Sequence, residues 1–381
     1  MQSDASDVTG SFWTNRQRQA SSLHEVPYRA CFKPQLPKFF IERYSSPGDT
    51  VFDPFSGRGT TAVEAALLLR TPISNDTNPL SEILTRPRLE PPGLDEVARR
   101  LSSITVDYGA RAGIDLSMFY HPRTEAEVVS LRDYLMERRE SGKEDRVDRW
   151  IRMVATTRLT GHSSGFFSVY SLPPNQAASP EEQERINRRL GQEPEYRDVK
   201  KIVLRKSASL LRDVSPEVLE RLSAVSGKAR FTSDDSRDLV SVGDGTVDLT
   251  VTSPPFINLV DYAKDNWMRL WFNCIDAGEV KGRITVLSDL GSWKSFISAT
   301  MRELFRITKP GGYVAFEVGE TRKADLKEIV RECGTEAGLE HVVTYINVQR
   351  FTKTSHIWGV ENNRLGTNTN RIVLFRRPAH S

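Results

Sequence analysis

The sequence predicts an α/β fold built on a doubly wound, mostly parallel sheet, with a largely helical insertion in the middle of the chain. Two short segments, Thr50–Asp53 and Asp248–Val251, are apolar and β-branched, which is typical of strands buried on both faces of a sheet. The first is followed by a glycine-rich loop and then by Ala62–Leu69, whose apolar character all round indicates a helix packed against that sheet. Residues 89–229 instead carry helical patterns.

Composition restricts the class of protein. Of the 381 residues, 38% are hydrophobic and 27% are charged, as expected of a soluble globular protein with a sizeable core. No run of eighteen apolar residues occurs, and the polar start Met1–Arg18 lacks the apolar core of a signal peptide, so we expect a cytoplasmic protein without a membrane partner. Three cysteines and six histidines are scattered without metal-ligand spacing, so no metal site is predicted. The net charge of +3 permits an anionic partner without requiring one.

The chain begins with a segment of little expected structure. Residues 1–22 are polar and are predicted to form a flexible arm. Three prolines within residues 27–37 exclude regular structure there. A short helix is expected over Lys38–Tyr44, followed by a turn at Pro47-Gly48-Asp49.

The loop after the first strand has the context of a nucleotide-type site. Pro54–Thr61 lies between a strand and a helix, where glycines let the backbone approach a ligand and the helix N-terminus supplies donors. Asp53 ends the strand, and Asp76 follows 23 residues later. By analogy with dinucleotide folds, Asp76 is expected to bind ribose hydroxyls. The alternative is a tight turn without a ligand, and the two acids argue against it.

The central insertion is predicted to be helical. Thr124–Glu140 reads as a helix capped by Thr124 with Glu127 three residues on, and Trp150–Leu159 as another. Residues 160–170 mix glycines, hydroxyls and aromatic side chains, which fits either a contact loop or a surface loop whose aromatics point inward.

Basic residues cluster at two places in this insertion. One is the Asn187-Arg188-Arg189 run, and the other is an expected helix over Glu195–Arg212, on which basic residues recur every four positions. A solvated basic face is the common explanation of such a stripe. Beside a base-binding loop it becomes a candidate phosphate track. The predicted nucleic-acid-binding residues are Arg188, Arg189, Arg197, Lys201 and Arg205.

The second strand named above ends in a proline loop, Thr252–Phe256. Neither proline has an N–H to donate, so the strand must stop in a stiff turn with free carbonyl groups. Ser253 and the Pro254 carbonyl can accept hydrogen bonds from an exocyclic amine, and the Phe256 ring can stack on a planar group. These features suit a nucleobase. The alternative is an ordinary strand end.

The C-terminal part supplies further sheet elements. Residues 230–239 read as a strand followed by an acidic turn, and Met301–Thr308 as a helix that ends at a Pro-Gly-Gly turn. Tyr313–Val318 is the next expected strand. His341–Phe351 and Arg371–Arg377 are strand-like and are predicted to pair as a closing antiparallel hairpin.

Four of these segments together resemble the amino-group DNA methyltransferases, which methylate cytosine N4 or adenine N6. Phe52–Thr61 resembles their S-adenosylmethionine loop, Asp-Pro-Phe-x-Gly-x-Gly-Thr-Thr, and Thr252–Phe256 resembles their catalytic loop. Asp76–Leu80 matches the segment after their second strand, and Phe32–Leu36 the loop that closes over the cofactor. The resemblance covers the chain to about residue 88 and again from residue 230.

The resemblance implies a Rossmann-like class I methyltransferase fold with S-adenosylmethionine as cofactor and no metal. The catalytic domain would comprise residues 23–88 and 230–381. Residues 89–229 form an insertion between the second and third motifs, which departs from the family's common arrangements, and its basic clusters make it the candidate for target recognition. The implied catalytic residues are Ser253, Pro254, Pro255 and Phe256. The implied cofactor-binding residues are Phe32, Asp53, Phe55, Gly57, Gly59, Thr60, Thr61, Asp76, Asn78 and Asp235, with Asp234 as the rival of Asp235.

The chemistry narrows the expected reaction. Methyl transfer to an amine needs alignment and no covalent intermediate, whereas methylation at cytosine carbon 5 needs a thiolate, and no Pro-Cys pair occurs. In the resembling family a serine at the head of the loop usually accompanies cytosine N4, so we expect site-specific DNA methylation at that atom after base flipping. Alternatives are an adenine-N6 or RNA-base methyltransferase, and a nucleic-acid binding module with a relic fold. DNA is the expected partner, and a cognate restriction endonuclease is a candidate second partner.

Overall fold

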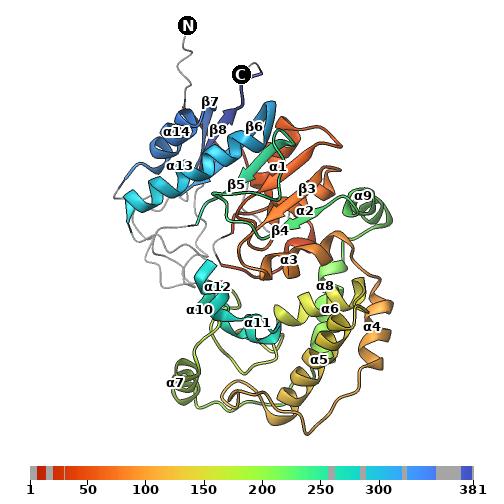
Figure 1. The fold of residues 1–381 in the computed structure, drawn as a ribbon. Coiled ribbons are helices and arrows are strands. Elements are labelled where there is room, and N and C mark those ends of the chain that lie inside the picture. The colour runs from red at the N-terminus through yellow and green to blue at the C-terminus, as the bar shows by residue number, and fades with distance from the viewer. Residues whose placement is uncertain are drawn as a thin grey trace.

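The computed structural model describes residues 7–13, 20–29, 31–255, 262–283, 289–319, 324–348 and 370–379. In this part of the chain a single sheet of eight strands is flanked by helices, and a second group of helices gathers at one end of the sheet (Figure 1). The strands are β1 (Asp7–Gly10), β2 (Thr50–Asp53), β3 (Thr71–Asn75), β4 (Arg230–Thr232), β5 (Val247–Thr252), β6 (Thr308–Val318), β7 (Glu340–Asn347) and β8 (Asn370–Arg376).

Fourteen α-helices and two short 3-10 helices accompany these strands in the described part of the chain. Those before β4 are η2 (Ser22–His24), α1 (Gln35–Tyr44), α2 (Thr60–Leu67), α3 (Leu80–Thr85), η3 (Arg86–Leu89), α4 (Leu94–Ser103), α5 (Pro122–Glu140), α6 (Arg146–Thr156), α7 (Pro180–Leu190), α8 (Val199–Leu211) and α9 (Pro216–Ser226). Those after β5 are α10 (Tyr262–Asp265), α11 (Trp267–Phe272), α12 (Ala277–Arg283), α13 (Leu290–Ile307) and α14 (Leu326–Glu336).

The strand order identifies the fold. The order is β1-β7-β8-β6-β5-β2-β3-β4, and every pair is parallel except the two that involve β8. The chain runs outward from β2 through β3 to β4, then returns to β5 on the other side of β2. This reversal between β2 and β5 is a topological switch point, where open α/β sheets place their ligand crevice. The predicted doubly wound sheet with a closing antiparallel hairpin is confirmed, the hairpin being β7 and β8.

Both faces of the sheet are covered, which explains why its central strands are apolar without alternation. In β2, Val51 packs with α1 on one face, while Phe52 packs with α13 and α14 on the other. Each of these two side chains has at most 1% of its surface exposed. Burial of such side chains stabilises the fold by roughly 1.5–3 kcal/mol each.

The helices between α3 and β4 form their own core, continuous with that of α2 and η3. Trp150 of α6 lies at its centre, fully buried, and its indole N–H donates to the Ser207 hydroxyl of α8 at 3.0 Å. In Figure 1, α4 to α8 and α10 to α12 lie at the same end of the sheet, whereas α9 lies beside α2 and β3. The two helices that were expected here begin earlier than predicted, at Pro122 and Arg146.

The predicted cap of α5 is wrong. His121 caps this helix, and its ring accepts a hydrogen bond from the Arg123 amide. Thr124 and Glu127 lie inside the helix and serve tertiary packing instead, because Thr124 bonds the Arg197 backbone and Glu127 accepts from the Tyr196 hydroxyl at 2.8 Å. Thr124 could bond either the start of its own helix or a residue distant in sequence, and in the structure it bonds the distant Arg197.

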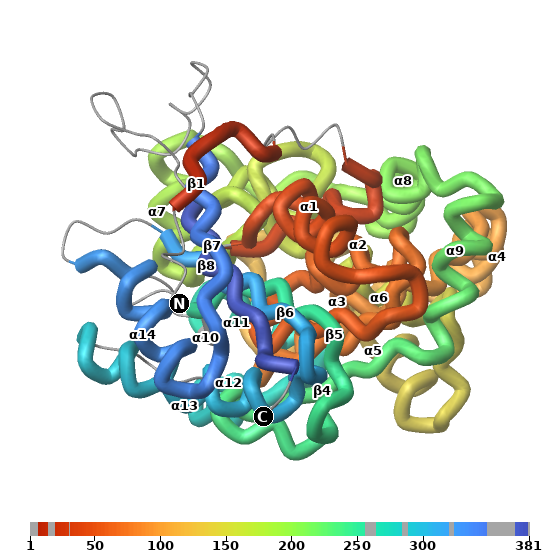
Figure 2. The backbone as a smooth tube through the Cα atoms, turned by 90° about the horizontal axis from the view of Figure 1, so that it is seen from above, coloured from red at the N-terminus to blue at the C-terminus, as the bar shows by residue number. Residues whose placement is uncertain are grey.

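The prediction of a loose arm over residues 1–22 is wrong where the structure describes that segment. Residues 7–10 form the edge strand β1, which pairs in parallel with β7 (Figure 2). Beyond the strand, Trp13 is buried against Phe39 and Phe40 of α1. Tertiary pairing with a strand more than 330 residues away orders a segment whose local sequence is polar.

No helix in the described part of the chain combines the length and the apolar character needed to cross a membrane. The two longest helices there, α5 with 19 residues and α13 with 18, both carry charged side chains.

Candidate active site

The glycine loop between β2 and α2 has a geometry that only glycine meets comfortably. Gly57 and Gly59 have φ angles of +51° and +71°, in the left-handed region. A Cβ at Gly59 would also lie 2.1 Å from the Thr85 hydroxyl, so any side chain there would collide with α3. The loop is closed by hydrogen bonds from the Phe55 amide to Asp53 and from the Gly59 amide to the Ser56 carbonyl. Thr60 and Thr61 then begin α2.

The glycine loop and the proline loop start at the same edge of the sheet. β2 and β5 are parallel neighbours in register, with Phe52 opposite Thr250. At their ends, the Thr252 hydroxyl donates to the Asp53 carboxylate at 2.6 Å, and the Thr61 hydroxyl donates to the Val251 carbonyl at 3.0 Å. These bonds join segments almost 200 residues apart, so the two motifs form one site.

Two acids lie at this edge with raised pKa values, Asp53 fully buried and Asp76 half-buried. Burial raises the pKa of Asp53 to about 7, against hydrogen bonds from Thr252 and the Phe55 amide that lower it. Burial likewise raises the pKa of Asp76 to about 6, and the amides of Asn78 and Gly57 oppose the change. Perturbed carboxyl groups of this kind cluster at functional sites. No group of three or more metal-binding side chains occurs among the described residues.

Asp76 ties the loop after β3 to the glycine loop. Its two carboxylate oxygens accept hydrogen bonds from the Gly57 amide at 2.8 Å and from the Asn78 amide at 2.9 Å. Asn78 is only 2% exposed, and its side-chain Nδ2 has no hydrogen-bond partner among the described residues. A buried donor without a partner is costly, and a bound ligand with an acceptor oxygen would satisfy it.

Asn75, which the sequence analysis did not single out, fastens three strand ends together. Its amide nitrogen donates to the carbonyl groups of Pro54 and Asp234, and its amide oxygen accepts from the Thr232 hydroxyl and the Asp234 amide. It thereby fixes the ends of β2, β3 and β4 relative to one another. The structural role of Asn75 could not be predicted from the sequence, because its four hydrogen-bond partners come together only in the folded sheet.

The structure separates the two rival acids of the turn after β4. The Asp234 carboxylate accepts hydrogen bonds from the amide and hydroxyl of Ser241, which shape the turn. Asp235 is paired with Arg237, and this hydrogen-bonded pair lowers the pKa of the Asp235 carboxyl. The Asp235 carboxylate also accepts a hydrogen bond from the Arg237 backbone amide at 2.9 Å, and its role toward a ligand stays a prediction.

Aromatic side chains from separate elements flank the same turn. The rings of Phe55 and Phe296 are 5.8 Å apart, and the Arg237 guanidinium lies 5.6 Å from the Phe296 centroid. Phe55 is half-buried, so part of its ring is accessible. Phe32, from the loop before α1, is also half-buried and packs against a different cluster, that of Phe39 and Phe40.

A buried arginine places the loop that carries Phe32. Arg58, within the glycine loop, donates to the Val26 carbonyl at 2.8 Å and to the Phe32 carbonyl at 3.5 Å. Arg88 lies behind it, fully buried, and donates to the carbonyl groups of Leu23 and Arg58. The segment before α1 is thus anchored directly on the glycine loop.

The proline loop is described as far as Pro255, and Phe256 lies outside the described residues. Pro254 is buried, and the Pro255 carbonyl accepts a hydrogen bond from the Trp293 indole at 3.3 Å. The Ser253 hydroxyl lies near the carboxylate of Glu317, close to the end of β6, and lowers the pKa of that carboxyl. Glu317 was missed from the sequence, because a single acid in a strand carries no local signal.

Glu317 is a buried carboxyl group with two polar partners. It is 7% exposed, and the side-chain amide of Asn370 on β8 donates to it at 2.8 Å. Burial raises its pKa, and the hydrogen bonds from Asn370 and Ser253 oppose that rise. The register explains the arrangement, since Thr252 lies opposite Phe316, which places the next residues of both strands side by side.

Of the predicted basic stripe on the insertion, Lys201 and Arg205 lie on α8, and Arg197 lies just before it. The Arg197 guanidinium donates to the carbonyl groups of Ser163, Phe166 and Ser168. It therefore holds the 160–170 loop, whose Phe166 and Phe167 point inward. All three bonds come from Nη1 of Arg197, so a role of this half-buried residue in a phosphate track stays a prediction.

The other predicted basic residues are accessible but lie on two different helices. On α8, Lys201 is 85% exposed and pairs with Asp198 at 3.3 Å, while Arg205 donates to the Ser164 carbonyl at 3.0 Å. Arg188 and Arg189 are exposed at the end of α7. In Figure 1, α7 lies away from α8, so these residues do not make one continuous surface row.

Comparison with known proteins agrees with the motifs. Residues 2–85 match a family model described as DNA methylase, of the N6 and N4 type. The chain is 32% identical over 75 residues to the type II methyltransferase M.MjaII of Methanocaldococcus jannaschii, which is 20% of this chain and 14% of that protein. It is 22% identical over 294 residues to the type II methyltransferase M.BsoBI of Geobacillus stearothermophilus, covering 68% of this chain and 54% of that protein.

The matched regions thus span about half of one of these relatives and a smaller part of the other. Among solved structures, the chain aligns with TrmN from Thermus thermophilus at 12% identity with a TM-score of 0.36, over 95% of this chain and 52% of that one. The fold assignment therefore rests on the strand order described above.

Proposed function

We propose that the protein transfers the methyl group of S-adenosylmethionine to an exocyclic amine of a DNA base, namely cytosine N4. The comparisons support this proposal, because they point to an amino-group DNA methyltransferase family. One observation carries the proposal. The glycine loop and the proline loop are joined at the switch point of the sheet by the Asp53–Thr252 hydrogen bond. A cofactor on the first loop and a base on the second would then be neighbours.

The residues present fit the cofactor. The side-chain Nδ2 of Asn78 is a donor without a partner among the described residues and could donate to an acceptor of the cofactor. The Asp76 carboxylate retains lone pairs for ribose hydroxyls. The Asp235 carboxylate would accept a hydrogen bond from the adenine amino group, and the exposed part of Phe55 would contact the adenine ring. When bound, S-adenosylmethionine supplies an electrophilic methyl group on a positively charged sulfur.

The proline loop would hold the target amine. The Ser253 hydroxyl, which would donate to the nearby Glu317, keeps its lone pairs for an N–H of the amine, and the Pro254 carbonyl would accept the second N–H. Two such bonds favour a pyramidal nitrogen, whose lone pair is more nucleophilic than that of a conjugated amine. Alignment of this lone pair with the methyl group supplies most of the rate acceleration.

The base must leave the duplex to reach this site. Extrusion costs a few kcal/mol, and stacking on Phe256 is proposed to offset part of that cost. The choice of cytosine follows from the serine at the head of the loop, by resemblance to the family. The helices between residues 89 and 229 are proposed to contact the DNA around the flipped base, with Lys201, Arg205, Arg188 and Arg189 as accessible cations.

Label transfer tests the role of Ser253. Wild-type protein and Ser253→Ala are incubated with plasmid DNA and methyl-labelled S-adenosylmethionine. We expect the variant to bind the cofactor normally by calorimetry and to transfer label about a hundredfold more slowly, because the amine loses an acceptor. Ser102→Ala, an exposed serine on α4, serves as the control. Equal transfer rates for wild type and Ser253→Ala would remove Ser253 from the mechanism.

A further inference from the structure

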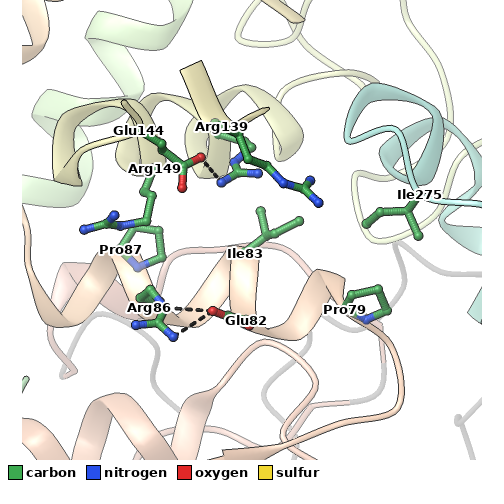
Figure 3. A pocket seen from close by; sticks show the side chains of 10 residues that line it. Pro79, Glu82, Ile83, Arg86, Pro87, Arg139, Glu144, Arg149 and Ile275 are labelled. Carbon is green, nitrogen blue, oxygen red and sulfur yellow. Dashed lines mark hydrogen bonds and ion pairs between the residues drawn. The ribbon is translucent and has the colours of Figure 1, made fainter. Parts of the chain in front are cut away.

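A second candidate site lies beside the first, at the junction between the sheet domain and the insertion. A pocket of about 370 Å³ separates α3 and η3 from the end of α5 and the start of α6. Four arginines and two glutamates are among the ten residues that line it: Arg86, Arg139, Arg149, Arg152, Glu82 and Glu144. Figure 3 shows Arg86 and Glu82 on one wall and Arg139, Glu144 and Arg149 on the other.

The carboxylates do not neutralise all of these cations. Arg86 pairs with Glu82 at 2.8 Å, and Arg152 pairs with Glu144. Arg149 reaches Glu90, outside the pocket lining, at 3.3 Å. No carboxylate lies within ion-pair distance of Arg139 in the described part of the chain, so the pocket keeps an excess of positive charge.

Two of the arginines also present unused donors. The Nε atoms of Arg149 and Arg152 are buried and have no hydrogen-bond partner among the described residues, and Arg152 is only 6% exposed. Burial lowers the pKa of Arg152, and so do the charges of Arg139 and Arg149, while Glu144 opposes this change. Buried donors beside like charges are unfavourable unless an anion with several acceptor oxygens fills the space.

We propose that this arginine pocket binds a phosphate group. Guanidinium groups bind phosphate through paired hydrogen bonds, and the unused Nε donors together with the free charge of Arg139 match that chemistry. The pocket is several times larger than one phosphate, and Ile83, Pro87 and Ile275 give it apolar walls that suit an attached sugar. A phosphodiester of a nucleic-acid backbone therefore fits better than an isolated anion.

The position of the pocket indicates which phosphate. Pro79 lines it and directly follows Asn78, whose unpartnered donor belongs to the candidate cofactor site. A backbone phosphate held here would therefore lie beside the candidate cofactor site. This assignment to the DNA backbone rests on the proposed function, whereas the phosphate chemistry of the pocket does not.

Arg139→Gln tests the proposal, because Arg139 has no ion-pair partner to leave uncompensated. Binding of a fluorescent 20-base-pair duplex is measured by anisotropy over a series of salt concentrations. We expect the variant to bind roughly fivefold to tenfold more weakly and the slope of log K against log salt to fall by about one, as for one lost phosphate contact. Arg99→Gln, an exposed arginine on α4, should match wild type.

A second arm uses inorganic phosphate. Thermal unfolding is followed in sodium phosphate and in sodium chloride at equal ionic strength, and phosphate should raise the midpoint of wild type by a few degrees but not that of Arg139→Gln. If Arg139→Gln loses the protection by phosphate but binds DNA as tightly as wild type, the pocket binds a small phosphate ester and not the DNA backbone. A variant that matches wild type in both arms would overturn the proposal. Phosphate protection in a protein that transfers no methyl group would reject the proposed function and leave the pocket intact.

Discussion

Ser253 lies in a recognisable motif, but its orientation is proposed to depend on Glu317, which lies outside the motifs. The Ser253 hydroxyl has one proton, and donation of that proton to the nearby Glu317 would orient both lone pairs away from the carboxylate. The side-chain amide of Asn370 donates to Glu317 at 2.8 Å. Glu317 is therefore proposed as a positioning residue that acts through Ser253 and does not touch the substrate.

Glu317→Gln should lower kcat without weakening cofactor binding. The amide of glutamine can donate to Ser253 and so occupy a lone pair that the amine needs. We expect kcat for methyl transfer to fall about tenfold to a hundredfold, with the affinity for S-adenosylmethionine and the thermal midpoint close to those of wild type. Glu340→Gln, an exposed glutamate on β7, is the matched control. A kcat within twofold of wild type would refute the positioning role, and a large fall in thermal midpoint would indicate a structural one.

At the scale of the elements, two carboxyl groups lie at the ends of β2 and β3, that of Asp53 buried and that of Asp76 half-buried. The pKa of Asp53 is raised from its ordinary 3.8 to about 7. Between about pH 4 and 7, the folded protein therefore holds a proton on Asp53 that the unfolded chain has already released. The stability supplied by this protonation is complete at low pH and is lost as the pH rises through 7. A cation bound beside Asp53 would favour the ionised form and lower that pKa again.

Cofactor binding is therefore expected to release protons near neutral pH. At pH 6.5 we predict release of between about half a proton and one proton per site, because Asp53 and, to a smaller extent, Asp76 are still protonated in the free protein. At pH 8.5 the release should be close to zero. Calorimetry in buffers of different ionisation enthalpy measures it, and Asp53→Asn should reduce it while the exposed Asp95→Asn does not. Binding enthalpies that do not depend on the buffer at pH 6.5 would contradict the assignment.

Local sequence was sufficient for the elements that carry the motifs. The strand Thr50–Asp53 was predicted with its observed bounds, because its apolar residues, the glycine loop and the following helix all indicate one strand–loop–helix unit. Asp7–Gly10 was not recognised as a strand, because its stability comes from pairing with β7 and not from its own residues. The same holds for Glu317, whose partners Ser253 and Asn370 come from two other parts of the sequence.

At the scale of the whole molecule, the sheet brings distant segments together in a way that the motifs anticipated only in part. The meeting of the glycine and proline loops follows from two parallel strands at a switch point, which the sequence already indicated. The arginine pocket does not follow from the sequence, because its cations come from η3, α5 and α6 with no common spacing. Likewise, the basic residues near α8 suggested a stripe, yet Arg197 turned out to hold a loop.

The most direct test of the central claim identifies the methylated atom. Unmethylated plasmid DNA is incubated with the protein and S-adenosylmethionine, digested to nucleosides and examined by mass spectrometry. The account predicts N4-methylcytosine, formed by wild type and strongly reduced with Ser253→Ala. N6-methyladenine in its place would contradict the assignment of the base, and DNA without any new methylated nucleoside would contradict amine methylation of DNA by this site.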